Sequence, residues 1–526
     1  MSFVSYEFMA FVAVLAFVYY LVPRRAQWIV LLVGSAWFYY VCDAAQAIYI
    51  AAAIVITYVW SLLIYRMIEN EEAHIASLGD DVSRKEKRQH RISFRKKRNC
   101  VLAVGIVLLL ALLVGTKYLG FILGNIPIFG GTGDMFTDVA IPLGISFFTL
   151  QTIGYLVDIS RGLISPERNI LRLALFIAFF PQLVQGPISR FSELSETLGR
   201  EHDFNAQNMV FAIERILWGF FKKLVIADRA LIYVQEVVND VPDYRGGMAF
   251  ICIVIYTLQI YADFTGGIDI TIGVAQCFGV KVMENFERPY FSTSLKEYWR
   301  RWHISMARWF REYLFYPLSI CGWMKAVSGF MGKVFGAGAS KKVPVYLSSF
   351  IVWFLTGLWH GASWNFVTWG IMNFLILMIS EELEPLYARF HNCFAWSNTR
   401  GYHIFMIIRT LAMLGILKMF DCFTDLGQMV DMLLSVFEPA GWHEAVSGGL
   451  LGFGLAAWDY IILIIGTIIM WAVSMRQEYH GSVRAQIKAL PGFVRCIIWC
   501  GLFFAVVTLG EYGVGYEAAN FIYNQF

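Results

Sequence analysis

Two of the nine histidines stand out by their surroundings in the sequence. His360 ends an apolar run over residues 348–359 and is followed by Gly-Ala-Ser-Trp-Asn. His303 lies in a charged and aromatic stretch over residues 298–311. An imidazole titrates near neutral pH, so histidine is the side chain best suited to general-base catalysis. The pattern alone leaves two interpretations of His360 open: a hydrogen-bonding residue between helices, or a catalytic base.

The depth of His360 makes it a candidate for a functional role, although a deep histidine is more often a hydrogen-bonding residue between helices. If Lys341 and Lys342 mark the cytoplasmic edge of a helix, His360 lies about 27 Å further along it, at about 1.5 Å per residue. An ionisable side chain at membrane depth is costly and is a candidate for a functional site by default. A neutral imidazole is also the ionisable base that is least costly to bury.

The composition indicates the elements that must hold these histidines. Of 526 residues, 58% are hydrophobic and 15% charged, and the mean hydropathy is +0.58. Soluble domains average about 45–50% apolar and about 25% charged residues. These values exclude a disordered chain, a secreted disulfide scaffold and an ordinary cytosolic enzyme. The net charge of +3 is no nucleic-acid signature. The nine dispersed cysteines argue against a disulfide framework and against a zinc site, so we expect no metal.

Apolar segments recur along the whole chain. A membrane helix needs about 20 mostly apolar residues. Candidate segments are residues 8–22, 27–42, 45–65, 100–123, 141–157, 170–184, 248–262, 343–359, 364–379, 403–420, 458–473 and 493–509. Several are short for a full crossing. We therefore expect an all-α polytopic membrane protein, one domain over residues 1–526, with about 11–12 transmembrane or re-entrant helices.

Basic residues predict the orientation of the first helices. Arg24 and Arg25 follow the first apolar segment, and the expected linker 67–99 contains nine lysines and arginines between residues 84 and 98. Residues 124–138 contain none. Because cytoplasmic loops carry the excess of Lys and Arg, we expect the N-terminus outside, residues 67–99 in the cytoplasm and residues 124–138 outside.

Three stretches carry a family resemblance. They are residues 284–290 (ENFERPY), 298–305 (YWRRWHIS) and 357–365 (GLWHGASWN). Together they resemble the membrane-bound O-acyltransferase family, nearest its alginate O-acetyltransferase branch and related to the teichoic-acid D-alanyl transfer branch. The C-terminal residues 521–526 also resemble the alginate branch.

The resemblance implies a bundle around a central tunnel, with catalytic core motifs over residues 284–365. It implies that His360 is the catalytic general base and that His303, the second histidine of the family, orients the donor or stabilises the oxyanion. Residues implied to bind substrate are Asn285, Arg301, Trp302, Trp359 and Asn365.

The resemblance also implies a reaction. An acyl group, with acetyl the expected one, passes from a cytoplasmic thioester to an extracytoplasmic polysaccharide or partner protein. Acetyl-CoA or another acyl thioester is then a substrate, and no bound cofactor is expected. The expected partners are the lipid of the cell membrane and an extracytoplasmic SGNH-type acetyltransferase, with no nucleic acid. Two alternatives remain: D-alanyl transfer to teichoic acid from a carrier protein, and a transporter or channel, because broken helices and intramembrane charges also mark transport paths.

Overall fold

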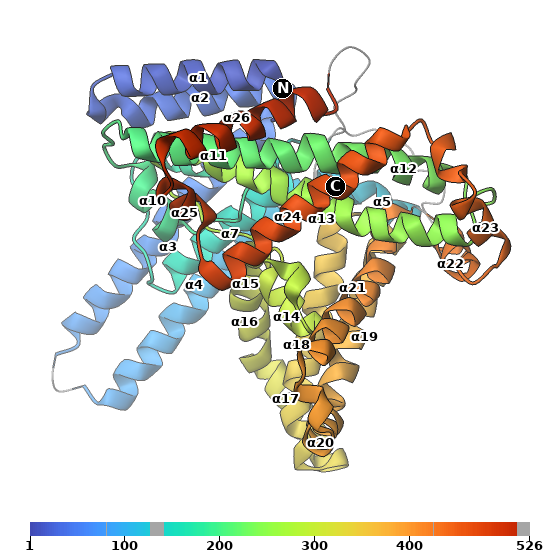
Figure 1. Cartoon of the computed structure of the whole chain (residues 1–526). Coiled ribbons are helices and arrows are strands. Elements are labelled where there is room, and N and C mark those ends of the chain that lie inside the picture. The colour runs from blue at the N-terminus through green and yellow to red at the C-terminus, as the bar shows by residue number, and fades with distance from the viewer. Residues whose placement is uncertain (80–81, 127–140, 424, 513–526) are drawn as a thin grey trace. The chain divides into compact units, whose positions relative to one another are not determined.

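The computed structural model describes residues 1–79, 82–126, 141–423 and 425–512 (Figure 1). These residues are mostly helical and include no strand, so the all-α prediction is confirmed. Most of segment 124–138 and all of residues 521–526 lie outside the described residues. The described contacts cluster into two compact units, residues 1–209 with 274–283 and residues 210–273 with 284–526. That the chain works as one domain stays a prediction.

Only some of the predicted apolar segments form described helices long enough to cross a membrane by themselves. Seven described helices are long and apolar enough to cross a membrane, or eight if α19 (Trp364–Glu382) and α20 (Glu384–Cys393), bent by 50°, count as one span. The seven are Ala47–Ser77, Arg84–Gly124, Gly247–Cys277, Ala337–His360, Arg400–Cys422, Ala457–His480 and Gly492–Leu509. The apolar helices α1 (Tyr6–Leu21) and α7 (Ile145–Ser160) have 16 residues each. Each is about 24 Å long, against the roughly 30 Å of a bilayer core. The chain is a polytopic membrane protein.

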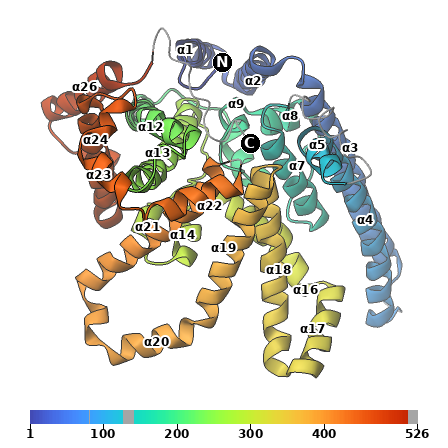
Figure 2. The same ribbon diagram turned by 90° about the vertical axis from the view of Figure 1, so that its right-hand side faces the viewer.

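The first unit is formed by the N-terminal helices. They are α1 (Tyr6–Leu21), α2 (Gln27–Asp43), α3 (Ala47–Ser77), α4 (Arg84–Leu113), α5 (Leu119–Gly124), α7 (Ile145–Ser160), α8 (Ile170–Ala178), α9 (Phe180–Leu183) and α10 (Phe191–Leu198). Helices α3 and α4 form a long hairpin (Figures 1 and 2).

Much of the expected linker 67–99 is helical. It forms the end of α3 and the start of α4, where Ser83 and Glu86 form a capping box. In that motif the two residues satisfy backbone N–H groups that a helix start leaves free. The Arg98 guanidinium donates to the Glu71 carboxylate at 2.7 Å, which ties the two helices together.

The second unit contains the longer C-terminal part. Its helices are α11 (Ala206–Phe220), α12 (Asp228–Asn239), α13 (Gly247–Cys277), α14 (Leu295–Arg301), α15 (Ile304–Phe310), α16 (Tyr316–Ile320), α17 (Gly322–Phe335), α18 (Ala337–His360), α19 (Trp364–Glu382), α20 (Glu384–Cys393), α21 (Arg400–Cys422), α22 (Leu426–Ser435), α23 (Ala440–Val446), α24 (Ala457–His480), α25 (Val483–Lys488) and α26 (Gly492–Leu509). The clustering assigns the first residues of α11 and the last of α13 to the other unit.

Buried ion pairs hold parts of this unit together. Arg215 donates to Asp269 at 2.9 Å and also pairs with Glu284, while Lys222 donates to Asp269 at 2.6 Å. Both cations and Asp269 are largely shielded from solvent. Burying a charge is tolerated when an opposite charge and hydrogen bonds satisfy it. These charges therefore join the α11 segment to α13.

Close helix packing positions His360. Helix α18 packs against α17 and α19, and α19 packs against α21 (Figure 2). Gly357 of α18 and Gly370 of α19 lie where the two helices meet, and a Cβ at either glycine would clash with a backbone carbonyl oxygen of the other helix. Small residues allow such close approach. His360, the last residue of α18, is thereby held beside the start of α19.

Candidate active site

His360 lies in an aromatic environment at the end of a membrane span. Its side chain is buried, 8% exposed, in the last turn of α18. The ring meets Trp369 edge-on with centroids 4.9 Å apart and lies nearly parallel to Phe366 at 6.2 Å. A helix C-terminus favours positive charge nearby, so the position suits a base that becomes protonated during a reaction.

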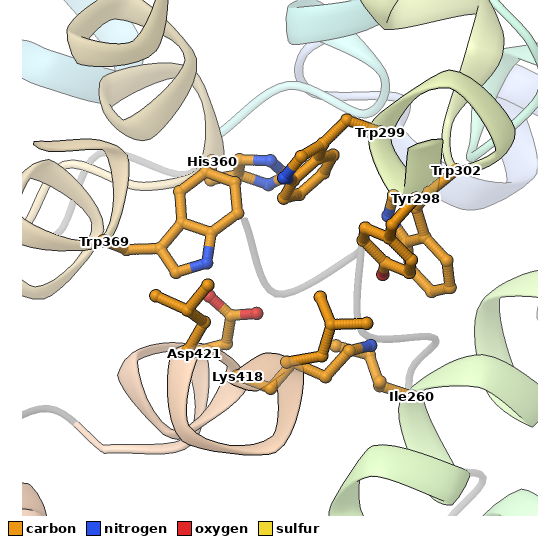
Figure 3. A pocket seen from close by; sticks show the side chains of 10 residues that line it. Ile260, Tyr298, Trp299, Trp302, His360, Trp369, Lys418 and Asp421 are labelled. Carbon is orange, nitrogen blue, oxygen red and sulfur yellow. The ribbon is translucent and has the colours of Figure 1, made fainter. Parts of the chain in front are cut away.

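The His360 side chain lines a cavity within the second unit (Figure 3). Together with the open solvent at its mouth, the cavity contains about 460 Å³ of space that protein atoms do not fill. The lining residues are Ile260, Tyr298, Trp299, Trp302, His360, Trp369, Leu414, Leu417, Lys418 and Asp421. A mostly apolar lining with a few convergent polar groups is typical of small-molecule sites.

Trp302 is the predicted substrate-binding residue that lines this cavity. It follows α14, whose start is capped by the Ser294 hydroxyl accepting from the Glu297 N–H at 3.2 Å. The Trp299 indole N–H donates to the Asn373 side chain at 3.2 Å. This hydrogen bond fixes one aromatic wall of the cavity to α19.

His303 is placed differently from His360. It is fully buried, with its ring 5.1 Å from Phe264 and 6.0 Å from Trp359 between centroids, and it is not among the lining residues. Its backbone is left-handed, φ 47°, directly before α15, a conformation that costs a non-glycine residue about 1–3 kcal/mol. Burial lowers the pKa of His303 to about 3. His303 is thus surrounded by aromatic side chains that lie outside the cavity lining.

Asn285 supports the start of α15. Its side-chain oxygen accepts from the Ser305 N–H at 3.0 Å and from the Ser305 hydroxyl at 2.9 Å, and its carbonyl accepts from the Ile304 N–H at 3.0 Å. The first N–H groups of a helix lack partners within the helix. Asn285 supplies partners for the first N–H groups of α15 and so helps to hold His303 in its unusual conformation.

Arg301 belongs to an ion-pair cluster outside the cavity lining. Its guanidinium lies 2.8 Å from Glu297 and 3.1 Å from Glu478, and Glu478 also pairs with Arg288. Burial raises the pKa of Glu297, but hydrogen bonds from Thr293 and Arg301 outweigh it and lower that pKa. The cluster ties the segment before the histidine motif to α24.

The remaining two predicted residues lie close to His360. The Asn365 amide donates to the Phe423 carbonyl, which joins the start of α19 to the end of α21. Trp359 lies between the two histidines, 5.2 Å from His360 and 6.0 Å from His303 between ring centroids. Neither residue is among those that line the cavity.

Two polar residues of the cavity were missed in the sequence. Lys418 and Asp421 both come from α21, on the side of the cavity opposite His360 (Figure 3). Lys418 was readable as a charge inside the apolar segment 403–420, which is itself a signal of function. The described residues include no group of three or more His, Cys, Asp or Glu side chains that could hold a metal ion.

Fold and cavity define a class of protein. A helical membrane protein that encloses a histidine, an ammonium group and a carboxylate among aromatic side chains can carry out proton transfer away from bulk water. The chain matches the membrane-bound O-acyltransferase family (MBOAT) over residues 160–423, half of its length, and belongs to that family.

Individual relatives agree with this family. The chain is 34% identical over 288 residues to a probable alginate O-acetylase AlgI of Azotobacter vinelandii, covering 54% of each chain. It is 29% identical over 316 residues to a peptidoglycan O-acetyltransferase of Helicobacter pylori, covering 55% of this chain and 57% of the relative. It is 25% identical over 244 residues to a teichoic acid D-alanyltransferase of Bacillus subtilis, covering 46% and 59%. The chain thus spans about half the length of the curated relatives it matches.

Proposed function

We propose that this protein is an O-acyltransferase that moves an acetyl group from a thioester to a hydroxyl group, with His360 as general base. The observation that carries the proposal is the position of His360, buried at the end of a membrane span and lining a cavity, inside the region that matches the family. The base that such a reaction needs must be shielded from bulk water yet reach a bound substrate.

The proposed reaction conserves atoms and charge. The acceptor oxygen adds to the thioester carbonyl carbon while His360 takes the hydroxyl proton. The carbonyl then re-forms, the carbon–sulfur bond breaks, and the departing sulfur receives the proton from His360. The products are an ester and a free thiol. Trp302, Trp299 and Trp369 supply apolar walls that exclude water, which would otherwise hydrolyse the thioester.

Charge distribution supports a cytoplasmic donor. The basic residues between 84 and 98 favour a cytoplasmic position for residues 67–99, with the N-terminus outside the cell membrane. A thioester such as acetyl-CoA is then offered from the cytoplasm, and the acceptor is an extracytoplasmic polysaccharide or an SGNH-type partner that completes the transfer. The names of the acetyl-transferring relatives support a cell-envelope polysaccharide as the final acceptor.

Donor consumption tests this function. Purified protein in lipid nanodiscs would be given acetyl-CoA together with alginate oligosaccharide or peptidoglycan fragments, and free thiol and ester-linked acetate would be measured. We expect both products in equal amounts from the wild type and neither from His360→Ala. Solute flux is measured in parallel with the same proteins in sealed lipid vesicles. If His360→Ala leaves acetylation unchanged while the flux across the vesicle membrane changes, transport replaces acyl transfer as the function.

A second candidate is D-alanyl transfer. The specific observation that favours it is the match to teichoic acid D-alanyltransferases of two bacteria, at 25% and 27% identity. These identities are lower than the 34% of the acetylase relative, so acetyl is the donor group we propose. Offering the purified protein a D-alanyl carrier protein in place of acetyl-CoA separates the two.

A further inference from the structure

Lys418 is a buried cation within a membrane span. It lies four residues before the end of α21, is 5% exposed, and its side chain lines the same cavity as His360 (Figure 3). Moving a charge out of water is unfavourable unless hydrogen bonds or an opposite charge compensate for the lost hydration. An ionisable residue retained at such a position calls for a function.

The partners of Lys418 are aromatic faces. Its ammonium nitrogen lies 4.3 Å from the ring centroid of Trp302 and 5.6 Å from that of Tyr290. The two rings are nearly parallel, with an interplanar angle of 9°. Aromatic faces attract a cation but are not the oxygen acceptors that its N–H groups seek. Within the described residues, the Lys418 ammonium has no hydrogen-bond partner.

Other buried lysines of this chain have oxygen partners. Lys117 donates to the Ser146 hydroxyl at 3.1 Å, Lys222 to Asp269 at 2.6 Å and Lys223 to Asp263 at 2.6 Å. Lys418 differs from all three, although Asp421 stands one turn further along α21 in the same cavity. The carboxylate of Asp421 lowers the cost of holding a cation there, and no ion pair between these two described side chains occupies the ammonium.

We propose that Lys418 binds the carbonyl oxygen of the thioester and stabilises the negative charge that develops on it during acyl transfer. This inference rests on the proposed function and adds a catalytic residue to it. Figure 3 shows Lys418 and His360 on opposite sides of the cavity, so an acyl group between them meets a base on one side and a cation on the other.

The electron balance assigns each group one task. When the acceptor oxygen bonds to the carbonyl carbon, the π electrons move onto the carbonyl oxygen, which accepts an N–H bond from Lys418. His360 takes the acceptor proton. The electrons return as the carbon–sulfur bond breaks, and Lys418 keeps its proton throughout. His303, which lies outside the cavity lining, is less well placed for this role.

The test compares lysine-to-methionine substitutions. Lys418→Met keeps an unbranched apolar stem and removes the N–H donors. Loss of one oxyanion donor typically lowers kcat by about 10²–10³-fold. With acetyl-CoA as donor in nanodiscs, we expect that fall in kcat with little change in KM. The matched control is Lys117→Met, another buried lysine, which should retain wild-type kcat.

The following outcomes decide the inference. A wild-type kcat for Lys418→Met, or a raised KM with kcat unchanged, would overturn it. If Lys418→Met fails to fold, as judged by thermal unfolding, Lys418→Ala with added propylammonium decides instead. A saturable rise in kcat with propylammonium, absent with propanol, supports the inference, and no rise overturns it. If the wild type itself consumes no acetyl-CoA, the proposed function fails. If the wild type is active and Lys418→Met has the same kcat, the proposed function stands and the role of Lys418 is overturned.

Discussion

Gly370→Ala tests whether close packing of α18 and α19 positions His360. A Cβ at residue 370 would overlap the Trp353 carbonyl oxygen and would lie 3.2 Å from its carbonyl carbon and 3.3 Å from the Gly357 Cα. Carbon atoms prefer separations of about 3.5–4.0 Å, so relieving the overlap moves the helices apart by roughly 1 Å. The obstacle is backbone, which cannot rotate away as a side chain can.

Two consequences of that movement can be estimated. Overpacking in a well-packed interior costs about 1–3 kcal/mol. A displacement of about 1 Å at a catalytic group can lower the rate about 10²-fold. We therefore expect Gly370→Ala to lower the free energy of unfolding by about 1–3 kcal/mol and the acetyl-transfer rate by roughly two orders of magnitude.

The assay pairs thermal unfolding of purified protein with thiol release from acetyl-CoA. The control is Gly329→Ala in α17, where an added Cβ meets no described atom within 4 Å. Alanine is the better helix former by up to about 1 kcal/mol, so this variant should be as stable as the wild type or more so, with unchanged turnover. Wild-type turnover in folded Gly370→Ala would refute the argument that this helix contact positions His360.

Two further predictions concern stability. Burial lowers the pKa of His303 from 6.5 to about 3. Below about pH 6.5 the unfolded chain therefore binds a proton that the folded chain does not. The free energy of unfolding then falls as the pH drops, by about 2 kcal/mol between pH 7 and pH 5. Thermal unfolding of His303→Gln should show that much less acid sensitivity; equal pH dependence in both proteins would contradict it. Asp269→Asn leaves Arg215 and Lys222 without their shared buried carboxylate and should lower the free energy of unfolding by about 3–5 kcal/mol. Glu382→Gln, at an exposed ion pair, should lower it by about 0–1 kcal/mol. Similar losses in the two variants would count against a buried ion-pair cluster.

The fold class was readable from the sequence because hydropathy reports the surrounding solvent directly. The number of spans was not, since a 16-residue apolar helix such as α1 or α7 has the composition of a span without its length. The helical start of α4 was also missed, although the Ser83 and Glu86 capping box is a local signal that the sequence displays. The charged residues of this segment predicted a loop in place of the helical start of α4.

The residues of the candidate site also differ in how well the sequence predicts them. His360 was found because its position depends on one apolar run, which is a local property. Arg215 and Lys222 pair with Asp269, which is 54 and 47 residues away in the sequence. Lys418 was passed over inside a segment interpreted only as a span. Which charges meet depends on helix packing, and a single sequence shows no trace of that packing.

Acetyl transfer by wild-type protein, His360→Gln and His403→Gln in nanodiscs tests the central claim most directly. His403 is an exposed histidine on α21 and serves as the matched control. With acetyl-CoA and a hydroxyl acceptor, we predict that His360→Gln lowers the rate of ester formation by about 10²–10⁴-fold, while His403→Gln transfers acetyl at the wild-type rate. Ester formation by folded His360→Gln at the wild-type rate would contradict the assignment of His360 as the catalytic base.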